Sequence, residues 1–268
     1  MPTGPASGYF ASGVPYRRLG RGPRTLVVLH GLSFEHKPPA RAIATLYGFL
    51  GDDYTVYNLL PKPHPPRGTT LADMAGDYAT TIRDAFEGPV DVLGTSTGGS
   101  IALYLAADHA GVVRRLVLHS AAHTLSDSAK QVQLEVAAHA ERGRWWKASV
   151  VLARMMFPGE GLASALSRPL TWLMAGMMAL TAPQDPTDLA VTVAAEDRLA
   201  FRDRLHEIAA PTLVVGGTRD PFYTPDLFRE TAAGIPDATL LLYEGKGHAP
   251  GGRQFARDVL AFLRAGGE

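Results

Sequence analysis

Residues 90–99 read Val-Asp-Val-Leu-Gly-Thr-Ser-Thr-Gly-Gly, and this stretch decides the expected fold. Its first four residues are typical of a short buried strand, and the following residues 100–107 are typical of a helix. Ser96 lies between the two, inside a G-x-S-x-G pattern. A serine on so tight a strand-to-helix turn needs small neighbours, and Gly94 and Gly98 meet that need. Ser96 is therefore a candidate nucleophile.

Short runs rich in leucine and valine alternate with amphipathic runs over most of the chain. This alternation predicts βαβ units and an α/β fold with a mostly parallel sheet. The expected strands are Thr25–His30, Thr55–Leu59, Val90–Leu93, Arg115–His119, Thr212–Val215 and Thr239–Tyr243, with Val14–Leu19 as an antiparallel edge strand. The expected helices are Ala40–Leu50, Leu71–Phe86, Ser100–Ala107, Asp226–Ala233 and Arg253–Arg264.

The alternation stops between Ala121 and Ala209, where helical periodicity continues without a convincing strand. An insertion of this length is too large for a loop. We expect residues 1–120 and 206–268 to form the core and residues 121–205 to form a helical cap. The expected breaks between the cap helices are Pro158, Pro169 and the turn Pro183–Pro186.

The composition is that of a soluble globular protein and excludes several classes of function. The chain has 268 residues, 46% of them hydrophobic and 19% charged, with 26 basic and 26 acidic residues. A chain without basic excess is not expected to bind nucleic acid. It has no cysteine, which excludes disulfides, thiolate metal ligands and cysteine nucleophiles.

Neither a secretory signal nor a membrane span is expected. Residues 1–10 lack the charged and apolar regions of a signal peptide, so a cytoplasmic location is the default expectation. The longest uncharged stretch, Pro169–Gln184, contains two prolines and is shorter than the roughly 20 apolar residues that a span requires. We expect it to be a buried or pocket-lining helix. Part of a methionine and aromatic cluster could line an apolar substrate pocket or simply form the cap core: Met155, Met156, Met174, Met177, Met178, Trp145, Trp146, Phe157 and Trp172.

A serine nucleophile requires a base, and the base requires an orienting carboxylate. In an α/β sheet such partners are expected just beyond the carboxyl ends of later strands. His248 follows the last expected strand through a glycine-flanked segment, and Asp220 follows the strand before it. The chain order Ser96, Asp220, His248 differs from the orders of the chymotrypsin and subtilisin folds. The rival acid is Asp127, which follows the strand ending at His119 but lies further from its end.

The turn His30-Gly31-Leu32-Ser33 after an early strand is a candidate for the oxyanion hole. The expected donors are the backbone N–H groups of Leu32 and Thr97. The other histidines, including His119 and His123, are expected to be structural because the reaction needs one base. Since the histidines lack a ligand spacing such as H-E-x-x-H, no metal site is expected.

As a set, four motifs resemble those of the α/β-hydrolase superfamily over nearly the full chain. They are residues 30–31 (HG), 94–99 (GTSTGG), 217–221 (GTRDP) and 247–249 (GHA). The resemblance implies an eight-stranded, mostly parallel sheet with a cap inserted after the sixth strand. The chain departs from many relatives at Thr97, where a larger residue is common, and this leaves the shape of the acyl pocket open.

These features predict a serine hydrolase that cleaves an ester, thioester or lactone of a small apolar molecule through an acyl-enzyme, without a cofactor. The same fold could instead support C–C bond hydrolysis, acyl transfer or perhydrolysis, or serve as a catalytically idle ligand-binding scaffold. Epoxide and haloalkane hydrolysis are disfavoured, because relatives with those activities have an aspartate at the position of Ser96. The sequence leaves the natural substrate and the oligomeric state open.

Overall fold

The computed structural model describes residues 6–33, 40–156, 169, 172–173, 175–177, 179–180, 182 and 185–265. Within them, eight strands form one sheet in the order β1-β2-β4-β3-β5-β6-β7-β8. The strands are β1 (Ser7–Tyr9), β2 (Pro15–Leu19), β3 (Arg24–Leu29), β4 (Tyr54–Leu59), β5 (Val90–Thr95), β6 (Val113–His119), β7 (Thr212–Gly217) and β8 (Ala238–Tyr243). The expected eight-stranded sheet is therefore confirmed.

Pairing from β4 through β8 is parallel, whereas β1 and β2 are antiparallel to their neighbours. The strand expected at Val14–Leu19 is present and antiparallel, but β1 pairs along its outer side, so it is not the edge of the sheet. Because β1 is only three residues long, it carries too little hydrophobic pattern to be recognised in the sequence.

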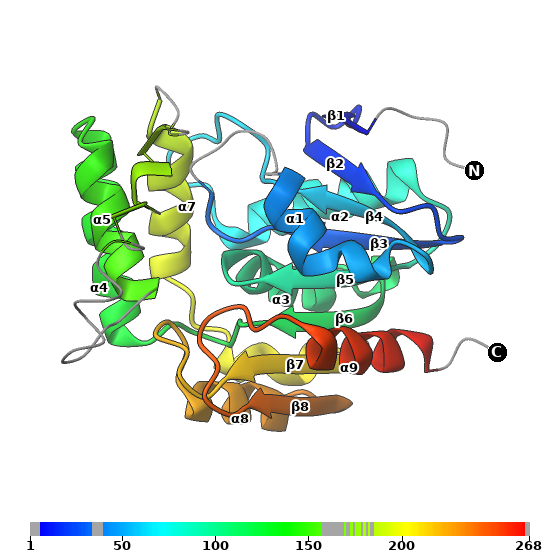
Figure 1. Ribbon diagram of the computed structural model, residues 1–268. Helices are drawn as coiled ribbons and strands as arrows, with labels where there is room; N and C mark the ends of the chain where they lie inside the picture. Colours follow the sequence, from blue (N-terminus) through cyan, green and yellow to red (C-terminus); the bar gives the residue numbers. More distant parts are fainter. Residues whose placement is uncertain are drawn as a thin grey trace.

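Helices cover both faces of the sheet (Figure 1). Apolar side chains of α1 (Ala40–Tyr47) and α9 (Arg253–Arg264) join one buried cluster, and those of α2 (Leu71–Ala85), α3 (Thr97–Asp108) and α8 (Pro225–Gly234) join the other. The central strands are buried on both faces, which explains their nearly continuous leucine and valine sequences. This packing fixes the carboxyl ends of β5, β7 and β8 relative to one another.

Between β6 and β7 the described residues form helices and no strand. The long helices are α4 (Asp127–Glu141), α5 (Trp145–Met156) and α7 (Thr187–Asp197), and they lie side by side beyond one end of the sheet (Figure 1). We refer to α4, α5 and α7 as the cap helices. Pro169 is described as helical, whereas Pro158 and Pro183 lie outside the described residues, as do Phe157, Met174 and Met178.

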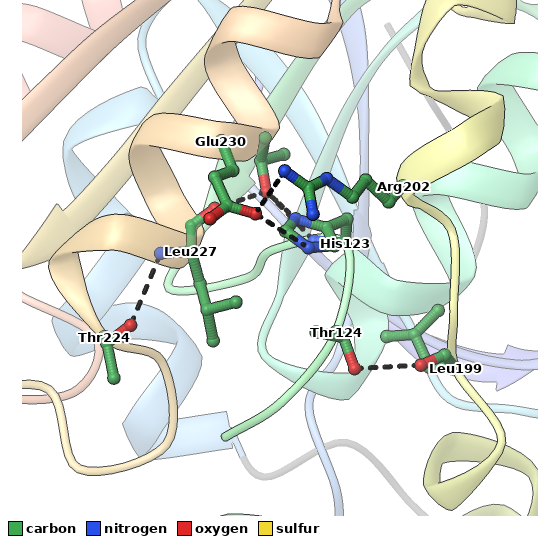
Figure 2. Close-up of polar contacts among 8 residues, drawn as sticks. His123, Thr124, Leu199, Arg202, Thr224, Leu227 and Glu230 are labelled. Carbon is green, nitrogen blue, oxygen red and sulfur yellow. Dashed lines mark hydrogen bonds and ion pairs between the residues drawn. The ribbon is translucent and has the colours of Figure 1, made fainter. Parts of the chain in front are cut away.

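The two chain segments that connect the cap helices to the core are hydrogen-bonded to each other. The Thr124 hydroxyl donates to the Leu199 carbonyl at 2.9 Å, and the Phe201 N–H donates to the His123 carbonyl at 3.0 Å. Figure 2 shows this crossing beside α8, where Glu230 lies 3.6 Å from His123 Nε2 and 3.4 Å from Arg202. The point where the chain returns from α7 is thus held to the core.

No helix among the described residues is long and apolar enough to cross a membrane.

Candidate active site

Ser96 lies at the turn between β5 and α3 with φ 52° and ψ −126°. This left-handed conformation is strained for a residue other than glycine, and such strain is concentrated at functional sites. The turn leaves no space for neighbouring side chains. A Cβ atom at Gly98 would lie 2.0 Å from the Leu29 carbonyl oxygen, and one at Gly94 would lie 2.6 Å from the Gly98 carbonyl oxygen. Both glycines of the sequence pattern are therefore required by backbone contacts.

The loop that follows β3 lies directly against Ser96. A Cβ atom at Gly31 would be 3.2 Å from the Ser96 Cβ and 3.9 Å from its Oγ. Thr97 is the first residue of α3, and helix geometry leaves its N–H without an intrahelical acceptor. The structure thus brings the Thr97 N–H and the Gly31–Leu32 turn to the same side of the sheet edge as Ser96. This is the arrangement that an oxyanion hole requires.

His248 and Asp220 form a direct pair. The Nδ1 atom of His248 lies 2.9 Å from Oδ2 and 3.1 Å from Oδ1 of Asp220, whose side chain is completely buried. The N–H groups of Phe222 and Tyr223 donate to Oδ1 at 2.9 and 3.3 Å. In the tautomer with its proton on Nδ1, the imidazole donates to this carboxyl group, and Nε2 is then the ring atom that can accept a proton.

The loop that carries His248 is tied to the neighbouring strand ends. The Ala249 N–H donates to the Ser120 hydroxyl at 2.9 Å, and the Arg219 N–H donates to the Lys246 carbonyl at 2.8 Å. The Ser96 N–H donates to the His119 carbonyl at 3.0 Å, directly before Ser120. Ser120 and Ala249 also have positive φ angles, 49° and 50°. Three strained turns, at Ser96, Ser120 and Ala249, are therefore joined at one edge of the sheet.

His119 is structural, as expected. Its ring is fully buried, its Nε2 donates to the Pro250 carbonyl at 3.0 Å, and its Nδ1 accepts from the Tyr47 hydroxyl at 3.0 Å. Burial lowers the pKa of His119 to about 3, so the ring is neutral at pH 7. The Tyr47 hydroxyl is also hydrogen-bonded to the Thr95 hydroxyl. These hydrogen bonds join Thr95, the residue before Ser96, to the loop that carries His248.

A buried carboxyl group that the sequence reasoning missed lies next to the turn that carries Ser96. Glu196 of α7 has no exposed surface, and it accepts hydrogen bonds from the Thr97 hydroxyl at 2.7 Å and the Ser100 hydroxyl at 2.8 Å. Burial is the main cause that raises the pKa of Glu196. Helical spacing was the available signal, because Leu189, Val193 and Glu196 follow the i, i+4, i+7 pattern of one helix face.

Tyr223 was also missed, and it contacts two members of the predicted triad. Its backbone N–H donates to Asp220, and its ring stacks on the His248 imidazole with 6.2 Å between centroids. The buried Tyr223 hydroxyl lies beside Ser96 and Ser100 but makes no hydrogen bond of ordinary geometry with any described residue. Burial is the main cause that raises the pKa of Tyr223 well above its usual value.

A cleft begins beside the Gly31–Leu32 turn and extends between residues 60–65 and α7. It contains about 600 Å³ of empty space, part of it open to solvent. Thr97 lines it, and its walls are largely apolar, with Leu60, Ile101 and Leu189 among them. His30 also lines it, and burial lowers the pKa of His30 to about 4, so this ring adds no charge at pH 7.

Two sequence-based alternatives do not fit the geometry. Asp127 is exposed in the first turn of α4, whereas Asp220 is the carboxylate hydrogen-bonded to His248. The described aromatic and methionine residues of the cap do not line the cleft beside Thr97. Trp172 and Met177, in the stretch expected to be a buried or pocket-lining helix, are exposed, as is Trp146 of α5.

Within the described ranges, no group of three or more histidine, aspartate or glutamate side chains is arranged to hold a metal ion. The arrangement combines a strained serine, a histidine–carboxylate pair and the Thr97 N–H, which has no acceptor within its own helix. That combination can carry out acyl transfer to a serine.

Comparison with known proteins agrees with this architecture. The model of the alpha/beta hydrolase family matches residues 26–260, which is most of the chain. The chain belongs to the alpha/beta hydrolase family. As a member of this family, it is a hydrolase, and the fold expected from its four motifs is confirmed.

Individual relatives are distant in sequence. The protein named "Putative carbamate hydrolase RutD" from Klebsiella pneumoniae is 28% identical over 188 residues, covering 69% of this chain and 68% of that protein. A hydrolase from Pseudomonas aeruginosa PA01 superposes with a TM-score of 0.79 at 23% identity, covering 97% of this chain and 98% of that one. The enol-lactonase from Burkholderia xenovorans LB400 gives 0.73 at 23% identity, covering 96% and 99%. At these identities the two structures establish similarity of fold.

Proposed function

We propose that this alpha/beta hydrolase is a serine hydrolase that cleaves an ester, thioester or lactone of a small apolar molecule through an acyl-enzyme. Ser96 is the nucleophile, His248 the base and Asp220 the group that orients the base. The observation that carries the proposal is the buried Asp220–His248 pair, 2.9 Å apart, at the sheet edge that also carries the strained Ser96.

In the first half of the reaction, His248 Nε2 takes the proton of the Ser96 hydroxyl while Oγ bonds to the substrate carbonyl carbon. The resulting imidazolium is stabilised by Asp220, and it then gives its proton to the leaving alcohol or thiol as the bond to the carbonyl carbon breaks. In the second half, His248 takes a proton from water and the hydroxide adds to the acyl carbon. The bond between that carbon and Ser96 Oγ then breaks to release the acid, and His248 gives the proton to Oγ. No cofactor is required.

Negative charge on the substrate oxygen is stabilised by the N–H groups of Thr97 and Leu32. The closeness of the loop to Ser96 supports this assignment, because a Cβ built at Gly31 would lie only 3.2 Å from the Ser96 Cβ. Loss of one such donor costs about 3 to 4 kcal/mol of transition-state stabilisation in a related arrangement.

The walls of the cleft support an apolar substrate. Leucine, isoleucine and proline side chains surround the space beside Thr97, and the Thr97 hydroxyl is directed to Glu196. The names of the relatives fit the same reaction type, because carbamates and enol-lactones, like esters, contain a carbonyl carbon bonded to a heteroatom leaving group.

A fluorophosphonate probe and a panel of p-nitrophenyl esters, thioesters and lactones test the proposal. Wild type should be labelled and should hydrolyse at least one class of substrate, whereas Ser96→Ala should be neither labelled nor active. Ser128→Ala, at an exposed serine of α4, is the matched control and should behave as wild type. Wild type that resists the probe, or equal labelling of Ser96→Ala, would overturn the proposal and favour a non-catalytic binding scaffold. Products of C–C cleavage or acyl transfer would show that the same triad has another reaction.

A further inference from the structure

Glu196 is a completely buried acidic residue with two hydroxyl partners at the start of the nucleophile helix. Thr97 and Ser100, the first and fourth residues of α3, each donate to one oxygen of its carboxyl group, at 2.7 and 2.8 Å. Gln133 of α4 adds a further polar contact. The group therefore joins two cap helices to the turn that carries Ser96.

The position of Glu196 is unfavourable for α7 and favourable for α3. It is the penultimate residue of α7, where the negative end of the helix dipole disfavours an anion. Its carboxyl group instead meets the amino-terminal turn of α3, where the dipole favours an anion. Because it is bound through side-chain hydroxyls, the backbone N–H of Thr97 stays available to the substrate. Burying a carboxyl group costs free energy, so the buried position of Glu196 indicates a role beyond the stability of α7.

The backbone that follows Glu196 is held to the core. The Leu199 N–H donates to the Glu196 carbonyl at 2.9 Å, and the Leu199 carbonyl accepts from Thr124 at the crossing shown in Figure 2. A displacement of α7 relative to the core must therefore be transmitted to Thr97 or must break its hydrogen bond to Glu196.

We propose that Glu196 is a positioning residue that couples the cap helix α7 to the oxyanion donor Thr97. By holding the Thr97 side chain, Glu196 fixes the orientation of the Thr97 N–H and makes the oxyanion hole competent only when α7 is seated on the core. This rests on the proposed function, because it assigns a task to the same site. A donor that is misdirected by a few tenths of an ångström weakens transition-state binding more than substrate binding.

The test compares Glu196→Gln, Thr97→Val and their double variant. Each single variant should lower kcat about tenfold with KM within about threefold of wild type, because the affected interaction belongs to the transition state. The double variant should be no worse than the poorer single variant, since both break one link. Thr97→Ser keeps the hydroxyl and should restore kcat to within about twofold of wild type.

Amide hydrogen exchange provides a readout independent of activity. Residues 97–100 should exchange faster in Glu196→Gln and Thr97→Val than in wild type. Thr81→Val, at an equally buried threonine of α2 remote from the site, is the matched control and should alter neither kcat nor exchange at residues 97–100.

Glu196→Gln and Thr97→Val proteins that fold normally and keep wild-type kcat and exchange would overturn the inference. If Glu196→Gln fails to fold, the comparison of Thr97→Val with Thr97→Ser decides in the same way. If wild type hydrolyses no acyl substrate, the proposed function fails, whereas the exchange measurement still decides whether Glu196 positions Thr97.

Discussion

Replacing Asp220 by asparagine should abolish most of the activity while leaving the fold intact. The carboxylate oxygen Oδ1 accepts from the Phe222 and Tyr223 N–H groups, and Oδ2 lies 2.9 Å from His248 Nδ1. The two N–H groups would retain the asparagine carbonyl at the Oδ1 position. Its NH₂ group would then face Nδ1 and donate to it. His248 would be held with its proton on Nε2, where it cannot accept the proton of Ser96.

The size of the effect follows from the cost of restoring the active tautomer. With the proton on Nδ1, the imidazole N–H and the asparagine NH₂ group would face each other in a buried site. Each of these donors would lack an acceptor, at a cost of about 1–3 kcal/mol. The two costs add to about 2–6 kcal/mol. Since each tenfold change in rate corresponds to about 1.4 kcal/mol, the middle of this range corresponds to about a thousandfold loss of kcat. A triad of this kind loses about 10⁴ in kcat by the same exchange.

Steady-state hydrolysis of the best p-nitrophenyl ester, the rate of fluorophosphonate labelling and thermal unfolding together measure the effect. Asp220→Asn should lower kcat and the labelling rate in parallel, with Tm nearly unchanged because both backbone contacts remain. Asp127→Asn, at the exposed rival carboxylate, is the control and should match wild type. An Asp220→Asn protein with native Tm and kcat within tenfold of wild type would refute the assignment of Asp220.

Three further changes test the packing around the site. Gly98→Ala places a Cβ 2.0 Å from a backbone oxygen and should lower the free energy of unfolding in urea by about 3 kcal/mol or more. Gly111→Ala is the control and should leave it unchanged, because a Cβ there would have no atom within 4 Å. Equal effects of the two changes would contradict the contact at Gly98. Tyr223→Phe removes a buried hydroxyl without a partner of ordinary geometry among the described residues, so the free energy of unfolding should rise by about 1 kcal/mol, and a clear loss would show that the hydroxyl is satisfied. Because the pKa of His119 falls from 6.5 to about 3 in the folded protein, the unfolded chain binds the proton first as pH drops, and stability is lost between pH 6.5 and 3. Lowering the pH from 7 to 5 should therefore lower the free energy of unfolding of wild type by about 2 kcal/mol more than that of His119→Gln, as measured by urea unfolding at both pH values.

The sheet was largely predictable from the sequence because its central strands are buried on both faces. That environment demands continuous apolar runs, and the runs at β3 to β8 were located to within about two residues at each end. The sequence could not reveal β1, whose three residues pair only with β2 at the edge. Helix α9 was predicted with the observed bounds, because its amphipathic pattern is strong.

The predicted site depended on residues at strand ends, and the structure brings two of them, Asp220 and His248, into contact. Glu196 and Tyr223 were not foreseen, since their role depends on which side chains the tertiary fold brings to Thr97 and His248. Helix periodicity can place Glu196 on a buried face but cannot identify its partners. The orientation of the Thr97 hydroxyl towards α7 likewise requires the packing of a segment almost 100 positions away in sequence.

The paired connections at His123–Thr124 and Leu199–Phe201 have an evolutionary consequence. Because the chain leaves and re-enters the core at one hydrogen-bonded crossing, the intervening segment can change in length or sequence without shifting the register of β6 and β7. Exchange of this segment would change the wall of the cleft that α7 supplies and leave the wall formed by core residues. Any replacement must still offer an acceptor to Thr97 and Ser100, which restricts the last turn of the incoming helix far more than the rest of it.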